Sequence, residues 1–479
     1  MRYVSTRGRS GAVGFADVLV GGLAPDGGLW IPEAYPSTAA ARAAPAPRPQ
    51  RPLSALEVDI RTPARLKGNL RYQDAAVEVL APYVGPGFDV ETLRSLIDDA
   101  YATFDDPAVC PLRQLDEDLW LLELFHGPTL AFKDVALQLV GRLLDHELRR
   151  QGRRATILVA TSGDTGSAAI AACLGRESLE IVVLHPAGRI SEVQRRQMTT
   201  VDAPNVHNLA VDGTFDDCQA LVKAMLADER LRTELGLAAM NSINWARVAA
   251  QAVYYAWAVD RLGGPTAFAV PSGNFGNALA GWVASRMGVD MTRLVVGTGR
   301  NDVLARWLAT GIIEPAPVTP TVAPAMDVGV PSNLERLLFD LLDRDAGRLA
   351  DLTGELRTDG RVEAPRDPLF AGARLDDDQI RTVMADTYRT SGVLIDPHTA
   401  VAVGAARGNA PTVGGPVVAV ATAHPAKFPD TVIEATGQTP DPPGRLRDVL
   451  GRPEQYQTVA DDVDAVRRFV RRSVAASLR

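Results

Sequence analysis

The sequence has 479 residues, of which 46% are hydrophobic and 23% are charged, and its formal net charge at pH 7 is −8. This length and composition are typical of a soluble globular protein with two or three domains. The acidic balance argues against general binding to nucleic acid or to anionic membranes, so any phosphate site must be a local arrangement.

The N-terminus predicts neither secretion nor membrane insertion. Residues 1–5 lack the apolar segment of a secretory signal, and no apolar run approaches the ~20 residues that a membrane helix needs. The three cysteines, Cys110, Cys173 and Cys218, have neither metal-ligand spacing nor the pattern of a disulfide framework. We therefore expect a cytoplasmic protein with reduced thiols and no metal site.

The first hundred residues differ in character from the rest. We expect an N-terminal module at 1–100, opening with a Gly-rich turn at 21–28 and containing an Ala/Pro-rich loop at 37–52. The region 101–479 is then the catalytic part of the chain.

A short turn ahead of a helix carries the most informative lysine. Residues 126–134 (HGPTLAFKD) precede apolar residues at 135, 139, 140, 143 and 144, a spacing that predicts a helix with one buried face. In a dry site the ammonium of Lys133 would lose proton affinity and become a nucleophilic amine, suited to a Schiff base with an aldehyde. The alternative is an ordinary surface lysine near a helix start.

From about residue 153 the sequence alternates β-branched runs with helical stretches. Such alternation predicts βαβ units around a parallel sheet. Strands are expected at 156–160, 179–184, 206–211, 267–270, 294–297 and 417–421. Helices are expected at 167–174, 216–228, 246–262, 277–288 and 334–344. We also expect a smaller α/β subdomain at about 153–245 and Pro/Gly-rich connections at 311–333 and 407–416.

Two polar loops follow predicted strands, where open α/β sheets bind their ligands. Residues 161–167 (TSGDTGS) offer hydroxyls, a carboxylate and backbone N–H groups at a helix start, which suits a phosphate or an α-carboxylate. Taken alone, a simple capped loop is the more common explanation. Residues 271–277 (PSGNFGN) have two glycines that let amides approach a phosphate, and Asn277 is expected to cap the next helix. The spacing fits neither a Walker loop nor a dinucleotide motif.

A third segment, residues 421–428 (ATAHPAKF), follows the last predicted strand. The Thr422 hydroxyl could face a ring nitrogen there, whereas His424 and Lys427 are ionisable side chains without an assigned role. A lysine after a turn, two phosphate-sized loops and a strand-end threonine form one constellation. Pyridoxal phosphate would use all of them, through its aldehyde, its phosphate and its pyridine nitrogen.

Long motifs extend this pattern almost from end to end. They include HGPTLAFKD (126–134), TSGDTGSAA (161–169), SEVQRRQMTT (191–200), NSINWARVAAQ (241–251), PSGNFGN (271–277), PAMDVGVPSNLERLLFD (324–340) and TAHPAKFPD (422–430). In this order they resemble the threonine synthase family of the long bacterial and fungal type, fold type II pyridoxal-phosphate enzymes. The resemblance implies an α/β fold like that of tryptophan synthase β, with two open parallel-sheet domains plus an N-terminal module. The segment 37–52 falls outside it.

The resemblance also implies roles for the cofactor-binding residues. Lys133 would form the Schiff base and carry protons, and Thr422 would face the pyridine nitrogen. The cofactor phosphate would lie on the loop formed by Gly273, Asn274, Phe275, Gly276 and Asn277.

The substrate-binding residues implied by the resemblance come from other motifs. The α-carboxylate would lie on Ser162, Gly163, Asp164 and Thr165. Donors to a substrate phosphate could be Arg195, Arg196, Asn244 and Arg247, because guanidinium groups suit phosphate geometry. Surface ion pairs are the alternative for the arginines. The pair Asn244 and Arg247, spaced i, i+3 on a predicted helix, ranks first.

The activity implied by the resemblance is conversion of O-phospho-L-homoserine and water to L-threonine and phosphate, by γ-elimination and β-addition of water. The alternative is a phospholyase that stops after elimination and releases a 2-oxo acid. Intact Lys133 and Thr422 disfavour a binding protein without chemistry, and a nucleotide-binding regulator would need a different motif spacing. We expect a monomer or homodimer that acts on a small molecule, with no nucleic acid or membrane partner.

Overall fold

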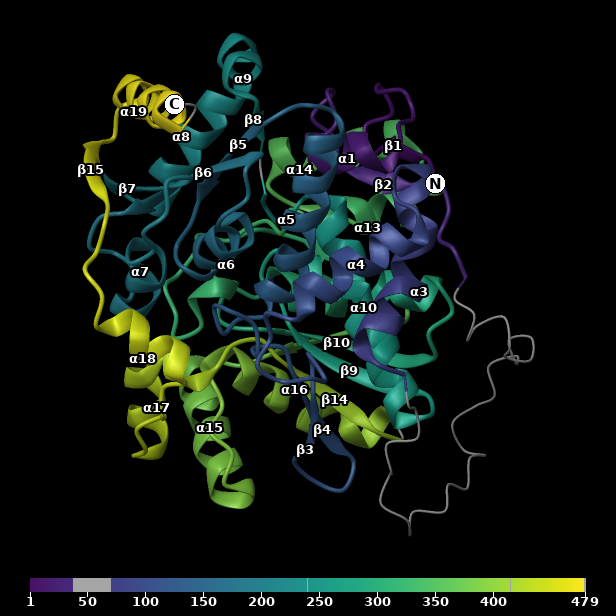
Figure 1. The fold of residues 1–479 in the computed structure, drawn as a ribbon. Coiled ribbons are helices and arrows are strands. Elements are labelled where there is room, and N and C mark those ends of the chain that lie inside the picture. The colour runs from purple at the N-terminus through teal and green to yellow at the C-terminus, as the bar shows by residue number, and fades with distance from the viewer. Residues whose placement is uncertain (38–69, 239, 414, 478–479) are drawn as a thin grey trace.

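The chain folds around two mainly parallel sheets in different parts of the molecule (Figure 1). The computed structural model describes residues 1–37, 70–238, 240–413 and 415–477, so residues 38–52 of the expected Ala/Pro-rich loop lie outside the described residues. The larger sheet has the strand order β13 (Phe370–Arg374), β10 (Met291–Thr298), β9 (Thr266–Pro271), β14 (Val417–Ala421), β4 (Leu119–Glu123), β3 (Leu112–Gln114). Only β3 runs antiparallel to its neighbour.

The smaller sheet is parallel throughout. Its strand order is β15 (Gln457–Ala460), β7 (Val206–Asp212), β6 (Leu179–Pro186), β5 (Ala155–Ala160), β8 (Leu237–Ala238). Each of the strands predicted from sequence lies within an observed strand, because β-branched runs buried on both faces have few alternatives. The expected subdomain at about 153–245 spans four strands of this sheet, and β15 joins them from the C-terminal end of the chain.

Helices separate and cover the two sheets. Between them lie α5 (Lys133–Arg150), α6 (Asp164–Cys173), α10 (Trp245–Leu262) and α11 (Gly276–Arg286). The outer face of the larger sheet packs on α16 (Pro397–Val413) and α15 (Asp377–Ser391), and that of the smaller sheet on α8 (Phe215–Ala227) and α19 (Val463–Ser477). In Figure 1 the yellow β15 and α19 lie beside the teal strands and helix of the smaller sheet.

The N-terminal part contributes a small layer beside α10. The strands β1 (Tyr3–Ser5) and β2 (Trp30–Pro32) pair antiparallel, and helices α1 (Phe15–Gly21), α3 (Tyr72–Val84) and α4 (Val90–Tyr101) pack near them. The remaining elements are α7 (Glu192–Thr199), α9 (Glu229–Leu235), α12 (Val303–Thr310), β11 (Ile312–Ile313), α13 (Leu334–Leu341), α14 (Ala346–Asp359), β12 (Val362–Glu363), α17 (Pro429–Thr436), α18 (Gly444–Leu450), and the 3-10 turns η2 (Gly85–Gly87), η3 (Pro324–Met326) and η4 (Pro425–Lys427).

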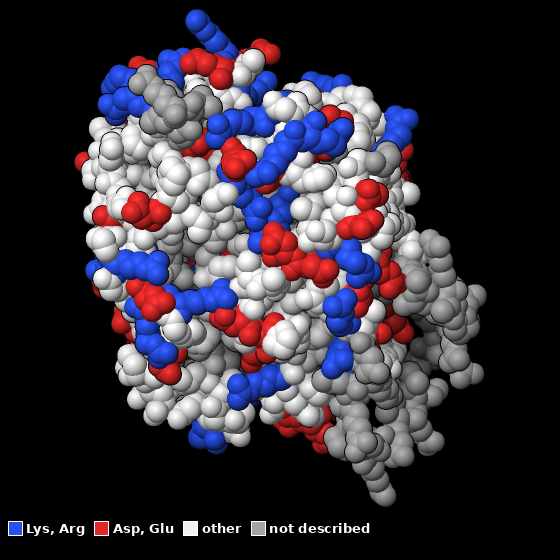
Figure 2. Space-filling model, viewed as in Figure 1, with Lys and Arg blue, Asp and Glu red and all other residues white. Residues whose placement is uncertain are grey.

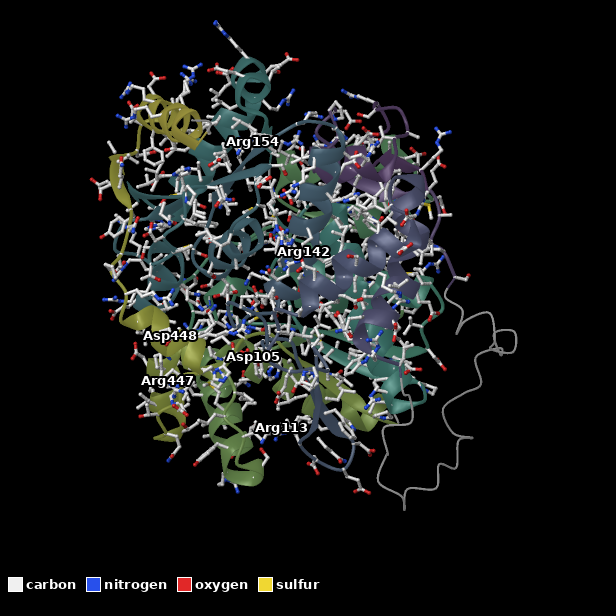
Figure 3. All side chains as sticks on the ribbon, viewed as in Figure 1. Asp105, Arg113, Arg142, Arg154, Arg447 and Asp448 are labelled. Atoms are coloured by element: carbon white, nitrogen blue, oxygen red, sulfur yellow. The ribbon has the colours of Figure 1, made fainter. Side chains whose placement is uncertain are left out.

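The helix after Lys133 differs from its prediction in one respect. Nearly all side chains of α5 from 134 to 145 are buried, not one face only, because α4, α6 and α10 pack on different sides of it. Even Arg142, labelled in Figure 3, is 5% exposed, and its Nε donates to Asp99 Oδ2 of α4 at 2.5 Å.

Two further boundaries correct the sequence predictions. The first helix after β5 begins at Asp164, not at 167, so half of the polar loop is helical. The expected connection at 407–416 is helical up to Val413. Buried residues from Ala400 to Ala406 anchor α16 against the larger sheet, and this packing outweighs the low helix propensity of Gly408 and Pro411.

The surface carries charges of both signs. Figure 2 shows Lys/Arg and Asp/Glu side chains interspersed over the face in view. Within the described residues, no helix has the length and apolar character to cross a bilayer, and no group of three or more His, Cys, Asp or Glu side chains could hold a metal ion.

Candidate active site

The ends of three neighbouring strands bring the predicted lysine and threonine together. Beyond β4 and β14 the chain segments run side by side, with Phe132 N donating to Thr422 O at 2.8 Å and His424 N donating to Leu130 O at 3.0 Å. Beyond β9, which neighbours β14, lies the loop that precedes α11. Because ligands of open α/β sheets bind at this edge, the candidate site lies here.

Lys133 is the first residue of α5, and the turn before it is closely held. Leu130 has a φ of +61°. A Cβ on Gly127 would lie 2.4 Å from Cβ of Asp134, so the turn requires glycine. Asp134 accepts hydrogen bonds from N and Oγ1 of Thr129 at 2.7 and 2.9 Å. These contacts fix the helix start and leave the Lys133 side chain 12% exposed.

A buried carboxylate faces Lys133 from the smaller sheet. Lys133 Nζ lies 3.3 Å from Asp164 Oδ2, and Lys427 Nζ lies 2.9 Å from Asp164 Oδ1. Gln194 Nε2 also donates to Oδ1 at 3.0 Å. Burial would raise the pKa of Asp164, but the ammonium groups of Lys427 and Lys133 hold it well below its usual range. Asp164 is therefore an anion between two cations.

The amine of Lys133 is poised to lose its proton. Burial lowers the pKa of Lys133; Lys427 and Arg247 lower it further, and Asp164 opposes them. The net direction is downward. A lysine whose pKa is lowered in this way is available as a base and nucleophile nearer neutral pH than an exposed lysine.

Arg247, on α10, is 4% exposed. Its Nε and Nη1 have no hydrogen-bond acceptor in the described part of the chain, and burial lowers its pKa to about 10. Asn244, expected on the same helix face, instead precedes α10 as its N-cap. Its Oδ1 accepts from Ala246 N and its Nδ2 donates to Leu19 O. Arg247 alone of this pair has donors to spare for an anion.

The loop between β9 and α11 also holds unused donors. Phe275 adopts a left-handed conformation (φ +62°), and α11 starts at Gly276. Asn277 is thus inside the helix and is not its cap, contrary to prediction. Its Oδ1 accepts from Tyr254 and Tyr255, which turns Nδ2 away from them. Among the residues that the structure describes, neither this Nδ2 nor the buried Oγ of Ser272 has a hydrogen-bond partner.

These donors fit a phosphate. The amides in the first turn of α11 have no acceptor within the helix, and the helix dipole favours an anion at this end. A Cβ on Gly273 would lie 2.6 Å from Ala325 O, so only glycine allows this loop path. Neutral hydroxyl, amide and backbone donors around a helix start match what the cofactor phosphate requires.

A second layer holds the loop in place. Asn333 donates through N and Nδ2 to Asn274 O at 3.2 and 3.3 Å. The fully buried Arg336 donates in turn to Asn333 Oδ1, Trp30 O and Ile243 O. Sequence reasoning did not single out Asn333, Arg336 or Ser272, although all lie in motifs that carry the resemblance. The helix Leu334–Leu341 also carries Glu335 and Asp340, so no sequence signal distinguished Arg336.

The loop after β5 turns sharply before α6. Gly163 has a φ of +147°, and a Cβ there would lie 2.5 Å from Gln194 Cδ. Thr161 Oγ1 accepts from Gly163 N and Gly166 N, each at 3.0 Å, which closes the turn. Ser162 is exposed and Thr165 half-buried, and Thr165 lines a cleft of about 940 Å³ between the N-terminal layer and the smaller sheet.

Other residues considered from the sequence have structural partners instead. Arg195 forms a two-pronged pair with Glu454 at 2.8 and 2.9 Å, and Arg196 contacts Glu192 and carbonyl groups near residue 450. Both arginines therefore bind the C-terminal segment, and their hydrogen-bond donors are used in these contacts. Burial lowers the pKa of His424 to about 4, and its Nδ1 accepts from Ala426 N. The structure thus brings together Lys133, Asp164 and Lys427, with Arg247 nearby.

Comparison with known proteins agrees with this geometry. Family models match residues 108–356 ("Pyridoxal-phosphate dependent enzyme"), 2–47 ("Threonine synthase N terminus") and 399–470 ("Threonine synthase, C-terminal"). The threonine synthase of Pseudomonas aeruginosa is 43% identical over 98% of both chains.

Solved structures agree as well. Pyridoxal-phosphate-bound threonine synthase from Brucella melitensis has a TM-score of 0.90 and 42% identity over 99% of both chains. Threonine synthase from yeast has a TM-score of 0.87 and 34% identity, again over 99% of both. These matches show that the chain belongs to the threonine synthase family of pyridoxal-phosphate-dependent enzymes.

Proposed function

We propose that this protein converts O-phospho-L-homoserine and water to L-threonine and inorganic phosphate. The observation that carries the proposal is a buried site in which Lys133 and an unpartnered Arg247 lie close enough to influence each other. One group suits proton transfer at a substrate carbon, and the other suits a phosphate. A substrate with an amino group and a phosphate ester satisfies both.

The cofactor would be held by neutral donors. Ser272 Oγ, Asn277 Nδ2 and the amides from Gly273 to Asn277 would bind the phosphate of pyridoxal phosphate, and the Thr422 hydroxyl would face its ring nitrogen. When bound, the cofactor supplies an aldehyde for covalent attachment and a conjugated ring that draws electrons from the substrate α-carbon. A hydroxyl opposite the ring nitrogen leaves that nitrogen without a formal charge partner, which favours elimination over transamination.

Lys133 would carry the protons. Its lowered pKa leaves the amine free to accept a proton from the substrate Cα. It would have to pass that proton on before it could accept a second one from Cβ. Phosphate departs from Cγ by cleavage of the carbon–oxygen bond. Protons return to the carbon chain and a water oxygen adds at Cβ, so the balance is one water consumed and one phosphate released. Burial of Lys133 and Asp164 keeps other water away from the reacting atoms.

The substrate would be held at both ends. The loop Ser162, Gly163, Asp164 and Thr165 would bind the α-carboxylate through backbone N–H groups and hydroxyls, since the Asp164 side chain is turned to the lysines. Arg247 would bind the phosphate. The Asn244 cap fixes the start of α10 and so the direction of Arg247. The same proposal places a monomer or homodimer in the cytoplasm, without a nucleic acid partner.

Isotope labelling tests the reaction. With O-phospho-L-homoserine in ¹⁸O-water, we expect one labelled oxygen in the threonine hydroxyl and none in the phosphate, because the carbon–oxygen bond breaks. Mass spectrometry of both products measures this. 2-Oxobutyrate in place of threonine would identify a phospholyase, and homoserine with labelled phosphate would identify a simple phosphatase; either result would overturn the proposal.

Removing the lysine should stop turnover without unfolding the protein. In Lys133→Ala, Asp164 keeps its contact with Lys427, so the fold survives. We expect the rate to fall at least about 1000-fold, because a base and the covalent anchor are both lost. Reductive trapping with borohydride should label Lys133 in the wild type and in the exposed control Lys223→Ala. An adduct on any other side chain, or near-wild-type activity, would refute the assignment.

Two buried arginines give a matched test of substrate binding. Arg247→Met removes an uncompensated buried charge, so stability should stay equal or rise by about 1 kcal/mol, while kcat/KM should fall about 10- to 100-fold through the lost phosphate contact. Arg336→Met removes donors to three oxygens and should cost at least about 3 kcal/mol of unfolding free energy. Urea unfolding and steady-state kinetics measure both. A destabilised but fully active Arg247→Met would contradict the phosphate role.

A single methyl group tests the phosphate loop. The variant Gly273→Ala would place a Cβ 2.6 Å from Ala325 O, which forces the loop to move. We expect the dissociation constant of pyridoxal phosphate to rise at least about tenfold, equivalent to about 1.4 kcal/mol. Absorbance titration of the cofactor-free protein measures it. The control is Gly264→Ala, where a Cβ meets nothing within 4 Å. Equal affinity in the two variants would count against this loop.

A further inference from the structure

Lysine is scarce in this chain and concentrated at the site. The sequence has 50 basic residues, of which only Lys67, Lys133, Lys223 and Lys427 are lysines. Two of these four face Asp164. Arginine meets almost every other need for positive charge here, so the site has a specific use for two compact ammonium groups, which carry a point charge on a slender stem. Lys133 has a role in the proposed chemistry, whereas Lys427 has none so far.

Lys427 is more deeply enclosed than Lys133. Its side chain is 0% exposed, and its Nζ donates to Thr129 O at 2.7 Å and pairs with Asp164 Oδ1 at 2.9 Å. Thr129 belongs to the turn before Lys133, where its N and Oγ1 hold Asp134. Gln197 Nε2 donates to the same Thr129 oxygen at 3.0 Å. Lys427 therefore connects the Lys133 turn to the loop expected to bind the substrate carboxylate.

The charge balance at Asp164 explains why the site contains a second lysine. In the proposed reaction the Lys133 amine must be uncharged for part of each cycle. A buried carboxylate that lost its only cation would be left uncompensated, at a cost of several kcal/mol. It would therefore hold the Lys133 proton in place. A second cation on the other carboxylate oxygen removes that penalty.

We propose that Lys427 is the standing counter-ion of Asp164, a positioning residue that lets Lys133 give up its proton while the 162–165 loop keeps its place. Besides Lys427 on η4, the charged groups that act on Lys133 are Asp164 on α6 and Arg247 on α10. Asp134, the next residue of α5, binds Thr129 instead and lies near Lys427. Without Lys427, one like charge near Lys133 disappears and Asp164 pairs with Lys133 alone. Both changes favour the ammonium form of Lys133.

The small number of lysines makes the test direct. Protein labelled with [ε-¹³C]lysine gives four side-chain signals, which NMR can follow against pH in the full-length, cofactor-free chain. In Lys427→Met we expect the titration midpoint of Lys133 to move up by at least about one pH unit. The matched control, Lys223→Met, removes an exposed lysine and should leave that midpoint unchanged. A midpoint that stays or falls in Lys427→Met would overturn the proposal.

Two further variants separate this role from simple packing. Lys427→Met combined with Asp164→Asn removes the carboxylate together with its counter-ion, so the Lys133 midpoint should return towards the wild-type value. If Lys427→Met does not fold, the combined variant should fold again, because the uncompensated charge is gone. A combined variant as disrupted as the single one would also overturn the proposal. The measurement needs neither cofactor nor substrate, so a negative result would leave the proposed reaction intact.

Discussion

One buried guanidinium holds together three segments on which the site depends. Arg336 donates to a carbonyl of β2, to a carbonyl just ahead of α10 and, through Asn333, to the loop that precedes α11. All three acceptors are neutral oxygens, and burial lowers the pKa of this arginine to about 10. Its charge is thus solvated by the protein itself. The N-terminal layer, remote in sequence, is part of the site's framework for this reason.

Arg247 differs from Arg336 in its hydrogen bonding. Both arginines are buried and carry the same charge. The donors of Arg336 are in use, whereas Nε and Nη1 of Arg247 have no acceptor in the described part of the chain. A buried charge without hydrogen-bond partners destabilises the folded protein, so it is retained only where another interaction offsets that cost. With Lys133, Lys427 and Arg247 opposed by Asp164, the pocket has an excess of positive charge, which suits a substrate that brings a carboxylate and a phosphate.

Local sequence patterns predicted those parts of the site that lie within one short stretch of sequence. The six predicted strands between residues 156 and 421 are apolar and β-branched, and the two loops at 161–167 and 271–277 are marked by Gly, Ser and Thr, so these were found. Strands β13 and β15 were missed because they are short, mixed in polarity and at sheet edges. The proposed role of Lys427 could not be predicted from the sequence either, because its partner Asp164 lies far away in the sequence. The prediction that Asn277 caps α11 was wrong because Phe275, rather than a small polar residue, takes the left-handed position before this helix.

The path of the chain has a consequence for how the protein is made. Strand β15 joins the smaller sheet beside β7, and α19 covers the same sheet, although residues 213–456 separate β15 from β7 in the sequence. During synthesis this sheet therefore cannot close until residues 457–477 have followed all of its other strands. Until then, one edge of β7 and the apolar residues beneath α19 remain open to chaperones or to unwanted partners.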